Sequence, residues 1–146
     1  MSFFGAIDVS ASGLTAERLR MDVTAENLAN AQTTRTASGG PYQRQEVVLQ
    51  QAGNGFGATL AGVVGDPSGS QGGVQVTGIV ADPTPDKLVY DPGHPDANAQ
   101  GYVRMPNVNP VTEMVDLISE SRSYEADVTA MQTAKQMYTK TLDLLK

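Results

Sequence analysis

Apolar residues recur at alternating steps of three and four near the start of the chain. The positions on this spacing are Phe4, Ile7, Ala11, Leu14, Arg18, Met21, Ala25 and Leu28. Heptad spacing of this kind predicts a helix that packs along one side on another helix, here with one cation in the contact stripe. We expect Asn30 to lie just past the end of this helix, because Asn tolerates the left-handed backbone found there.

The end of the chain carries the same rhythm over a longer stretch. The positions are Met114, Leu117, Ser121, Tyr124, Val128, Met131, Lys135, Tyr138, Leu142 and Leu145. Asn109 can cap this helix, and Pro110 suits its first position, where a missing N–H costs nothing. A helix of about 36 residues would be roughly 54 Å long at about 1.5 Å per residue. A small domain cannot cover that length, so the stripe needs a partner along the whole helix.

The segment between these two helices is rich in turn-forming residues. Thirteen of the 15 Gly and six of the eight Pro lie between residues 37 and 105, and both residue types disfavour helix interiors. Short strands are expected here, at Tyr42–Gln50, Phe56–Val64, Val74–Val80, Lys87–Tyr90 and Tyr102–Met105. The Gly- and Ser-rich composition of residues 65–73 predicts a flexible loop.

These patterns together predict an α+β fold. Residues 1–36 form an N-terminal helix, residues 37–105 a small central β-rich module with a flexible loop near 65–73, and residues 106–146 a C-terminal helix. The two long terminal helices are expected to form an antiparallel coiled-coil-like pair. The expected register places Ile7 opposite Tyr138, Leu28 opposite Met114 to Leu117, Arg18 near Glu125 or Asp127, and Lys135 near Asp8. Both charged positions are then paired with carboxylates; alternatively, their long stems reach out to solvent.

The two helices offer too little apolar surface to be stable when packed only on each other. Each fully buried large apolar side chain contributes roughly 1.5–3 kcal/mol. About a dozen such positions must offset the ordering of some 65 residues, at about 1–2 kcal/mol of backbone entropy each. We therefore expect the helices to be marginal in the isolated chain and ordered in an assembly.

The composition argues against several functional classes. The chain has no Cys, and its formal net charge is −6 without any block of Lys and Arg. A disulfide framework is therefore impossible, and nucleic-acid binding, which needs clustered cations, is disfavoured. Apolar runs are too short for a transmembrane segment, and the first cation, Arg18, comes too late for a cleavable signal. Taken alone, these features indicate a cytoplasmic protein.

One cluster of residues resembles a metal site. The single His94 lies in sequence near four carboxylates: Asp82, Asp86, Asp91 and Asp96. Metal binding requires such ligands to converge on one point. The Asp-Pro and His-Pro dipeptides here are typical of turns, in which Asp bonds its own backbone. We therefore expect turns and predict no metal site.

Other motifs that could support catalysis are weak. A dinucleotide-binding spacing is formed by Gly53, Gly55 and Ala58, but a strand-like stretch follows where that motif needs a helix. Glu113, Asp116 and Glu120 share one face of the last helix, which we interpret as a solvated or subunit-contacting face rather than an acid–base pair. We predict no enzyme activity, no catalytic residue and no cofactor.

Long blocks at both ends of the chain carry the pattern of a known family. The first block runs from Ser10 to Thr34 and contains Asn27-Leu28-Ala29-Asn30-Ala31, and the second runs from Asn107 to Lys146. They resemble the axial proteins of the bacterial flagellum, which are the rod, hook and hook-associated subunits. A third block, from Tyr90 to Asn109, resembles the proximal-rod proteins of the basal body, and the short chain agrees. Asp127 departs from the family pattern, which commonly has Asn there.

The resemblance implies a structural subunit of the proximal rod. Similar proteins polymerise with other rod and axial proteins into a hollow drive shaft that transmits torque and encloses the export channel. They pass through the flagellar type III export apparatus without a cleaved signal peptide, so the resemblance replaces the cytoplasmic expectation with the periplasmic rod. The implied partners are other axial proteins, further copies of the chain and the rod-to-inner-membrane-ring adaptor.

The assembly interface is predicted from the helix stripes and the end of the first helix. It comprises Phe4, Ile7, Leu14, Met21, Leu28, Asn30, Met114, Leu117, Tyr124, Val128, Met131, Tyr138, Leu142 and Leu145. Two other functions stay open. A soluble coiled-coil adaptor, whose β-module binds a single protein partner, would form a discrete oligomer. A metal-dependent enzyme centred on His94 would lose its function, but not its assembly, on His94→Ala.

Overall fold

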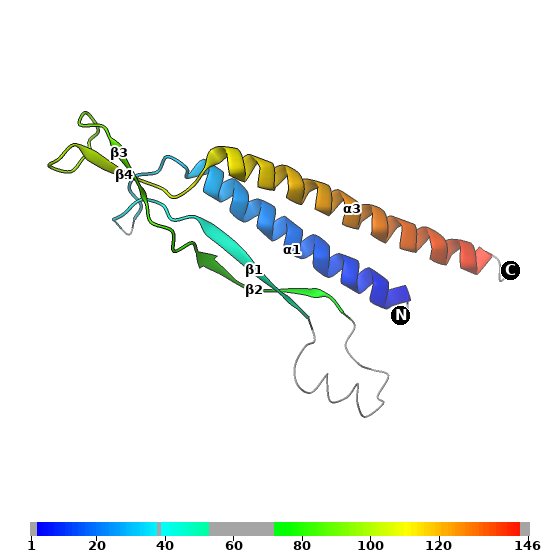
Figure 1. Cartoon of the computed structure of the whole chain (residues 1–146). Helices are drawn as coiled ribbons and strands as arrows, with labels where there is room; N and C mark the ends of the chain where they lie inside the picture. Colours follow the sequence, from blue (N-terminus) through cyan, green and yellow to red (C-terminus); the bar gives the residue numbers. More distant parts are fainter. Residues whose placement is uncertain (1–2, 38, 53–71, 144–146) are drawn as a thin grey trace, which may run out of the picture. The chain divides into compact units, whose positions relative to one another are not determined.

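Two long helices flank a small β region in the computed structural model, which describes residues 3–37, 39–52 and 72–143. The elements in chain order are α1 (Phe3–Ala29), β1 (Gln45–Gln51), β2 (Val74–Ala81), β3 (Lys87–Tyr90), β4 (Tyr102–Met105) and α3 (Pro110–Asp143) (Figure 1). This arrangement confirms the predicted α+β fold. The predicted strand Phe56–Val64, the spacing of Gly53, Gly55 and Ala58, and most of the 65–73 loop lie outside the described residues.

Both helix boundaries near the β region lie where the sequence predicts them. Helix α1 ends at Ala29, and the side chain of Asn30 then donates a hydrogen bond to the carbonyl of Glu26 and accepts one from Thr33. Helix α3 begins at Pro110. The backbone N–H of Val111 donates to Oδ1 of Asn109 at 3.1 Å, which is the expected N-cap.

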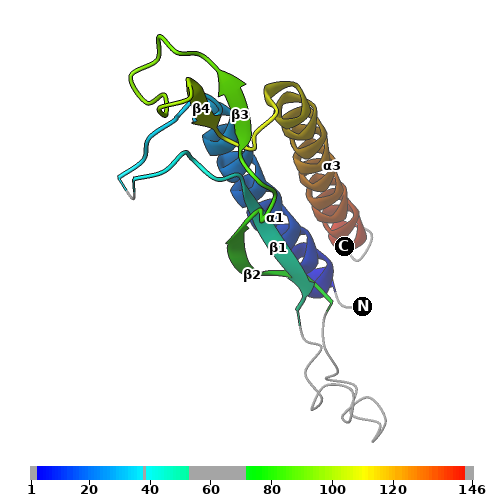
Figure 2. The same ribbon diagram turned by 60° about the vertical axis from the view of Figure 1, so that its left-hand side comes forward.

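The strands form two separate two-stranded sheets (Figure 2). β1 pairs with β2, and β3 pairs antiparallel with β4 so that Tyr90 lies opposite Tyr102. β3 and β4 occupy the predicted ranges, whereas β1 begins at Gln45 and not at Tyr42. At Arg44, just before β1, the backbone N–H donates to a side chain, Oδ1 of Asn107, and not to a neighbouring strand.

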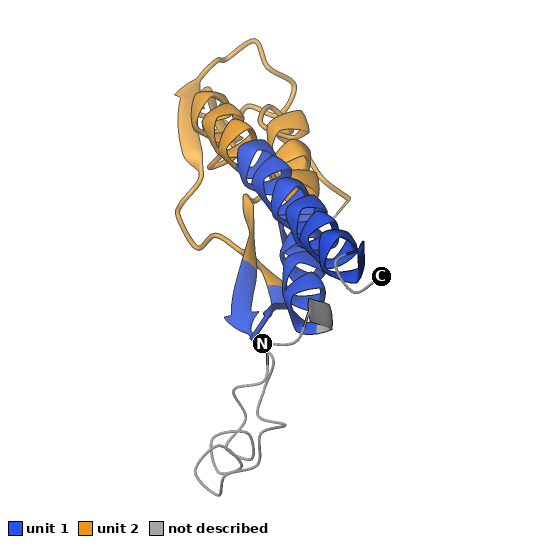
Figure 3. Cartoon of the chain, turned by 90° about the vertical axis from the view of Figure 1, so that its right-hand side faces the viewer, with its two compact units in different colours: residues 1–19, 48–78, 120–146 blue, residues 20–47, 79–119 orange. Residues whose placement is uncertain are grey.

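The chain divides into two compact units, each built from non-contiguous segments (Figure 3). Unit 1 combines residues 1–19, 48–78 and 120–146, and unit 2 combines residues 20–47 and 79–119. In the described part of unit 1, Ser12 Oγ accepts a hydrogen bond from the N–H of Val74. Among the described residues of unit 2, the buried apolar side chains include those of Val23, Tyr42, Val103, Pro106 and Val108.

The register of the two helices differs from the expected one by roughly one helical turn. In unit 1, a methyl group added at Gly13 would lie 2.8 Å from Oδ2 of Asp127. In unit 2, Asn27 is hydrogen bonded to Glu113, whereas the expected register placed it opposite residues 115–118. The expected pair of Ile7 with Tyr138 assumed a contact between large apolar side chains, and that of Arg18 with Glu125 or Asp127 assumed an ion pair. The observed contacts at Gly13 and Asn27 are made by small and polar residues.

The inward face of α3 is also shifted from the predicted stripe. Glu113 is 1 % exposed and Glu120 is 4 % exposed, whereas Met114 is 46 % exposed. The interpretation of Glu113 and Glu120 as part of a solvated or subunit-contacting face was therefore wrong, because both side chains are buried within the single chain. The side chain of Glu113 can leave water because it has hydrogen-bond donors inside unit 2, and a satisfied buried polar group costs little.

The β3–β4 hairpin depends on a glycine. Gly101 has φ +81°, and a Cβ there would lie 2.9 Å from Cε2 of Tyr90 and 3.3 Å from Cβ of Pro92. We expect Gly101→Ala to lower the free energy of unfolding by about 2–3 kcal/mol, since backbone strain and a ring displacement add. Gly39→Ala is a matched control because Gly39 has φ +90° but no atom within 4 Å of its Cβ position. Urea unfolding that gives equal losses for the two variants would contradict the role of the Tyr90 contact.

Candidate assembly interface

A saturated amide lies at the centre of unit 2. The side chain of Asn27 accepts hydrogen bonds from the hydroxyl of Tyr42 and the N–H of Gln45, both at 2.9 Å. It donates to the carbonyl of Gln45 at 2.9 Å and to Oε2 of Glu113 at 3.2 Å. Asn27 thus replaces a neighbouring strand at the edge of β1 and also joins α1 to α3. It is 1 % exposed, so these four bonds form away from water.

Glu113 links this amide to a cation. Its Oε1 accepts a hydrogen bond from Nε of Arg44 at 2.6 Å, while its Oε2 serves Asn27. The Arg44 guanidinium also pairs with Glu46 and lies 3.7 Å from Asp82. Burial alone would lower the pKa of Arg44, but the hydrogen bonds and charges of Glu113 and Glu46 outweigh it and raise that pKa. We call Asn27, Tyr42, Arg44, Gln45 and Glu113 the Asn27 network.

The segment before α3 is attached to the same region. Oδ1 of Asn107 accepts from the N–H of Arg44 at 2.8 Å, and its Nδ2 donates to the carbonyls of Asp82 and Thr84. The carbonyl of Val108 accepts from Nζ of Lys87 at 3.2 Å. The start of α3 is therefore held by the end of α1, by Arg44 just before β1, and by the turn before β3 together with Lys87 of β3.

Tyr42 makes part of this network sensitive to alkaline pH. Burial, followed by the charges of Glu26 and Glu113, raises the pKa of Tyr42 above its ordinary value of 10.0. The folded state therefore holds this proton more tightly than the unfolded state, so stability falls as pH rises above about 10. We expect Tyr42→Phe to lose about 1 kcal/mol at neutral pH and to lack this alkaline decline. Urea unfolding at several pH values checks this. An equally steep decline in the Tyr42→Phe variant would show that another group causes the loss of stability at alkaline pH.

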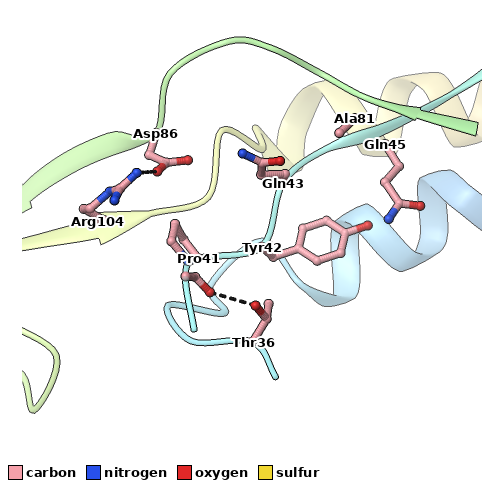
Figure 4. Close-up of a pocket in the computed structure, with 9 residues that line it drawn as sticks. Thr36, Pro41, Tyr42, Gln43, Gln45, Ala81, Asp86 and Arg104 are labelled. Atoms are coloured by element: carbon pink, nitrogen blue, oxygen red, sulfur yellow. Dashed lines mark hydrogen bonds and ion pairs between the residues drawn. The ribbon is translucent and has the colours of Figure 1, made fainter. Parts of the chain in front are cut away.

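A hollow of about 430 Å³ lies beside the network in unit 2. Figure 4 shows Tyr42, Gln43 and Gln45 on one side of it and the ion pair of Asp86 with Arg104 on the other. These two charged lining residues neutralise each other. The arrangement therefore leaves amides and a phenol at the wall, groups that hydrogen bond but do not exchange protons near neutral pH.

The predicted turns account for the residues around His94. Asp82 accepts hydrogen bonds from the hydroxyl and N–H of Thr84, which lower its pKa. Asp91 accepts from the N–H of Gly93, and Nδ1 of His94 accepts from the N–H of Asp96. In the part of the chain that the structure describes, no group of three or more His, Asp or Glu side chains is placed to hold a metal ion.

The predicted interface residues fall into two exposure classes. Those half-buried within the single chain are Ile7, Leu14, Met21, Leu28, Asn30, Leu117, Tyr124, Val128 and Met131. Met114, Tyr138 and Leu142 are exposed. The side chains of Phe4 and Leu145 lie outside the described residues. Residues of both classes therefore keep exposed surface within the single chain.

Sequence reasoning missed a further set of exposed apolar residues on α3. They are Val111, Val115, Ile118 and Met137. The first three follow the same three-four spacing as the predicted stripe but start from a different position, which was the available signal. The Asn27 network was also missed, although Asn27 and Glu113 lie in the two blocks that resemble axial proteins.

Comparison with known proteins identifies the family. The family described as flagella basal body rod protein matches residues 7–35, and the C-terminal region of the flagellar basal body rod FlgEFG proteins matches residues 99–144. Flagellar basal-body rod protein FlgC of Bacillus subtilis is 48% identical, with 100% of both chains covered. The chain belongs to the FlgC family of flagellar basal-body rod proteins. FlgC of Borreliella burgdorferi is 43% identical over 100% of this chain and 99% of its own, and that of Aquifex aeolicus is 38% identical over the same shares.

Membership of this family confirms the predicted class of function. The chain is a structural rod subunit of the flagellar basal body, and it assembles with other flagellar rod proteins. The adaptor alternative is not favoured by these relatives. Among the described helices, none is long and apolar enough to cross a membrane.

Proposed function

We propose that this subunit polymerises with other axial proteins into the proximal rod, a hollow drive shaft that transmits torque and encloses the export channel. The observation that carries this proposal is the exposed apolar surface of α3. Val111, Val115 and Ile118 are exposed in unit 2, and Met137, Tyr138 and Leu142 are exposed in unit 1. A monomer with so many exposed large apolar side chains on one helix has surface suited to protein contacts.

The end of α3 extends past its partner helix within unit 1. Gly13 lies against Asp127, so an antiparallel step places the first helical residue, Phe3, opposite about residue 137. Every described residue of α3 from Lys135 to Asp143 is exposed. Most helices in proteins are stabilised by packing of an apolar face rather than by their own propensity, and this end of α3 presents exposed large apolar side chains. We assign the contacts that would cover them to neighbouring axial subunits.

The predicted interface residues form the proposed contact surface. The half-buried positions, such as Leu14, Leu28 and Val128, would complete their burial against a neighbour, and the exposed positions would be covered entirely. The family resemblance supports three further partners: other copies of the chain, the rod-to-inner-membrane-ring adaptor and the flagellar type III export apparatus. We propose export without a cleaved signal peptide and a purely structural role without catalysis.

The proposal is tested by asking whether the protein is incorporated into the flagellar basal body. An affinity tag inserted between Gly65 and Gly73 is expected to co-purify with detergent-resistant basal bodies from a motile host. Deleting the last ten residues, which removes Leu142 and Leu145, is expected to abolish motility and incorporation. A tagged chain found only as a discrete soluble oligomer would overturn the rod assignment and favour the adaptor.

A further inference from the structure

Each terminal helix carries a second stripe of residues that faces away from the rest of the chain. On α3 this outer stripe contains Val111, Val115 and Ile118, which are 65 %, 60 % and 56 % exposed. On α1 the exposed positions Asp22, Ala25 and Ala29 follow the same three-four spacing. One stripe therefore presents large apolar side chains, and the other presents small ones that allow close approach of a second helix.

Charged residues continue both outer stripes. Along α3, the next two positions on the spacing after Ile118 are Arg122 and Glu125, and both are exposed. Along α1, the positions before Ala25 are Asp22 and Arg18, and both are exposed. The order of features is thus apolar, apolar, cation, anion along α3, and cation, anion, small, small along α1.

We propose that the outer stripe of α3 in one copy packs antiparallel on the outer stripe of α1 in a second copy of this chain. This arrangement places four pairs opposite one another: Ile118 on Ala25, Val115 on Ala29, Arg122 on Asp22, and Glu125 on Arg18. Both charge pairs are attractive, and both large side chains meet small ones. This inference rests on the proposed function and adds the partner and the register of one contact.

Orientation is decided by the charges. If the second helix ran parallel with Arg122 beside Asp22, Ile118 would face Arg18 and Glu125 would face Ala25. An apolar side chain against a cation, and an acid against alanine, would replace the second attractive pair. Electrostatic complementarity fixes register and suppresses alternatives even where each exposed pair adds little affinity. Because the two stripes differ, the contact is heterologous and can repeat from copy to copy, as the contacts of rings and open helical assemblies do.

Disulfide trapping tests the register directly, because the chain has no Cys. Two differently tagged copies, Ala25→Cys and Ile118→Cys, are expressed together in the motile host, and isolated basal bodies are oxidised. We expect the mixed disulfide between the two tags to dominate, since paired positions bring the Cα atoms within bridging distance. Ala29→Cys with Val115→Cys is the second in-register pair. Ala25→Cys with Val111→Cys is the control, because it lies one heptad out of register.

The outcomes separate this inference from the rod assignment. A dominant Ile118→Cys homodimer, or equal yields from the control pair, would overturn the proposed register. Incorporation of both in-register pairs without any cross-link would overturn the second-copy partner and leave the rod function standing. Failure of the tagged parent chain to enter basal bodies would instead overturn the rod function.

A charge exchange provides an independent test. Asp22→Arg and Arg122→Asp should each reduce motility several-fold, because each places like charges opposite one another. The double variant should recover most of the loss, since the pair is restored with reversed signs. Additive losses in the double variant would contradict the pairing. Urea unfolding of the isolated chains should show little change for any of the three, because both residues are exposed in the single chain.

Discussion

Asn27→Ala is expected to lower the free energy of unfolding of the isolated chain by about 3 kcal/mol or more, because each unsatisfied buried polar group costs about 1–3 kcal/mol. The substitution leaves the Tyr42 hydroxyl and both backbone groups of Gln45 without the partner that they have in the structure. It also removes one of the two donors that serve Glu113. Urea unfolding, followed by circular dichroism, measures the loss.

Asn30→Ala is the matched control for this prediction. Asn30 has the same side chain three positions later, but its side-chain hydrogen bonds are local, to Glu26 and Thr33, and the side chain is only half-buried. Its loss should cost about 1 kcal/mol or less, as for other local helix-end side chains. Comparable losses for the two variants would show that the hydrogen bonds of Asn27 contribute no more to the unfolding free energy than the local hydrogen bonds of Asn30.

The second large effect is expected in cells and not in the isolated chain. Tyr138→Glu combined with Leu142→Glu should change the unfolding free energy of the monomer by less than about 0.5 kcal/mol, because surface substitutions rarely do more. Both side chains are exposed in the single chain. The same pair should abolish motility, since two charges would be buried without partners in the proposed contact with a neighbour.

Gln132→Glu combined with Gln136→Glu controls for added negative charge on the same helix. Both glutamines are exposed, and neither belongs to the predicted interface. This variant should remain motile. Swimming in soft agar reports the difference, and the amount of rod protein in isolated basal bodies shows whether incorporation failed. Full motility of the Tyr138→Glu, Leu142→Glu chain would remove the end of α3 from the interface.

Local signals in the sequence were sufficient to place most of the described elements. Asn109 and Pro110 set the start of α3 because their chemistry acts within one turn of the helix. The β3–β4 hairpin follows from two short alternating stretches separated by turn dipeptides. In both places the residues that determine the element are neighbours in the chain, so no knowledge of distant contacts is needed.

The inward faces of the helices could not be read in the same way. Heptad spacing identified two amphipathic helices, but the rule that large apolar residues point inward assigned Met114 to the wrong side of α3. These helices carry several apolar stripes. One stripe contacts other elements of the same chain, and the others remain exposed. A single sequence shows how many apolar stripes exist but not which partner covers each one.

The Asn27 network was beyond sequence reasoning for a different reason. Polar residues inside a helix are ordinarily interpreted as solvated, and Glu113 fits that expectation until its donors are known. Arg44 lies in a segment that was predicted as strand, and its partner Glu113 lies in helix α3. The network depends on three distant segments meeting, and no local pattern reports such a meeting.

The wide sequence separation within the Asn27 network has a consequence for the timing of folding. The bond of Asn27 to Glu113 joins residues 86 positions apart, and that of Arg44 to Glu113 joins residues 69 apart. Such high contact order slows folding relative to helix formation. Neither bond can form before residue 113 is present, which is about three quarters of the way along the 146-residue chain. Because these bonds join distant residues, we expect the helical segments of unit 2 to form before the network that connects them.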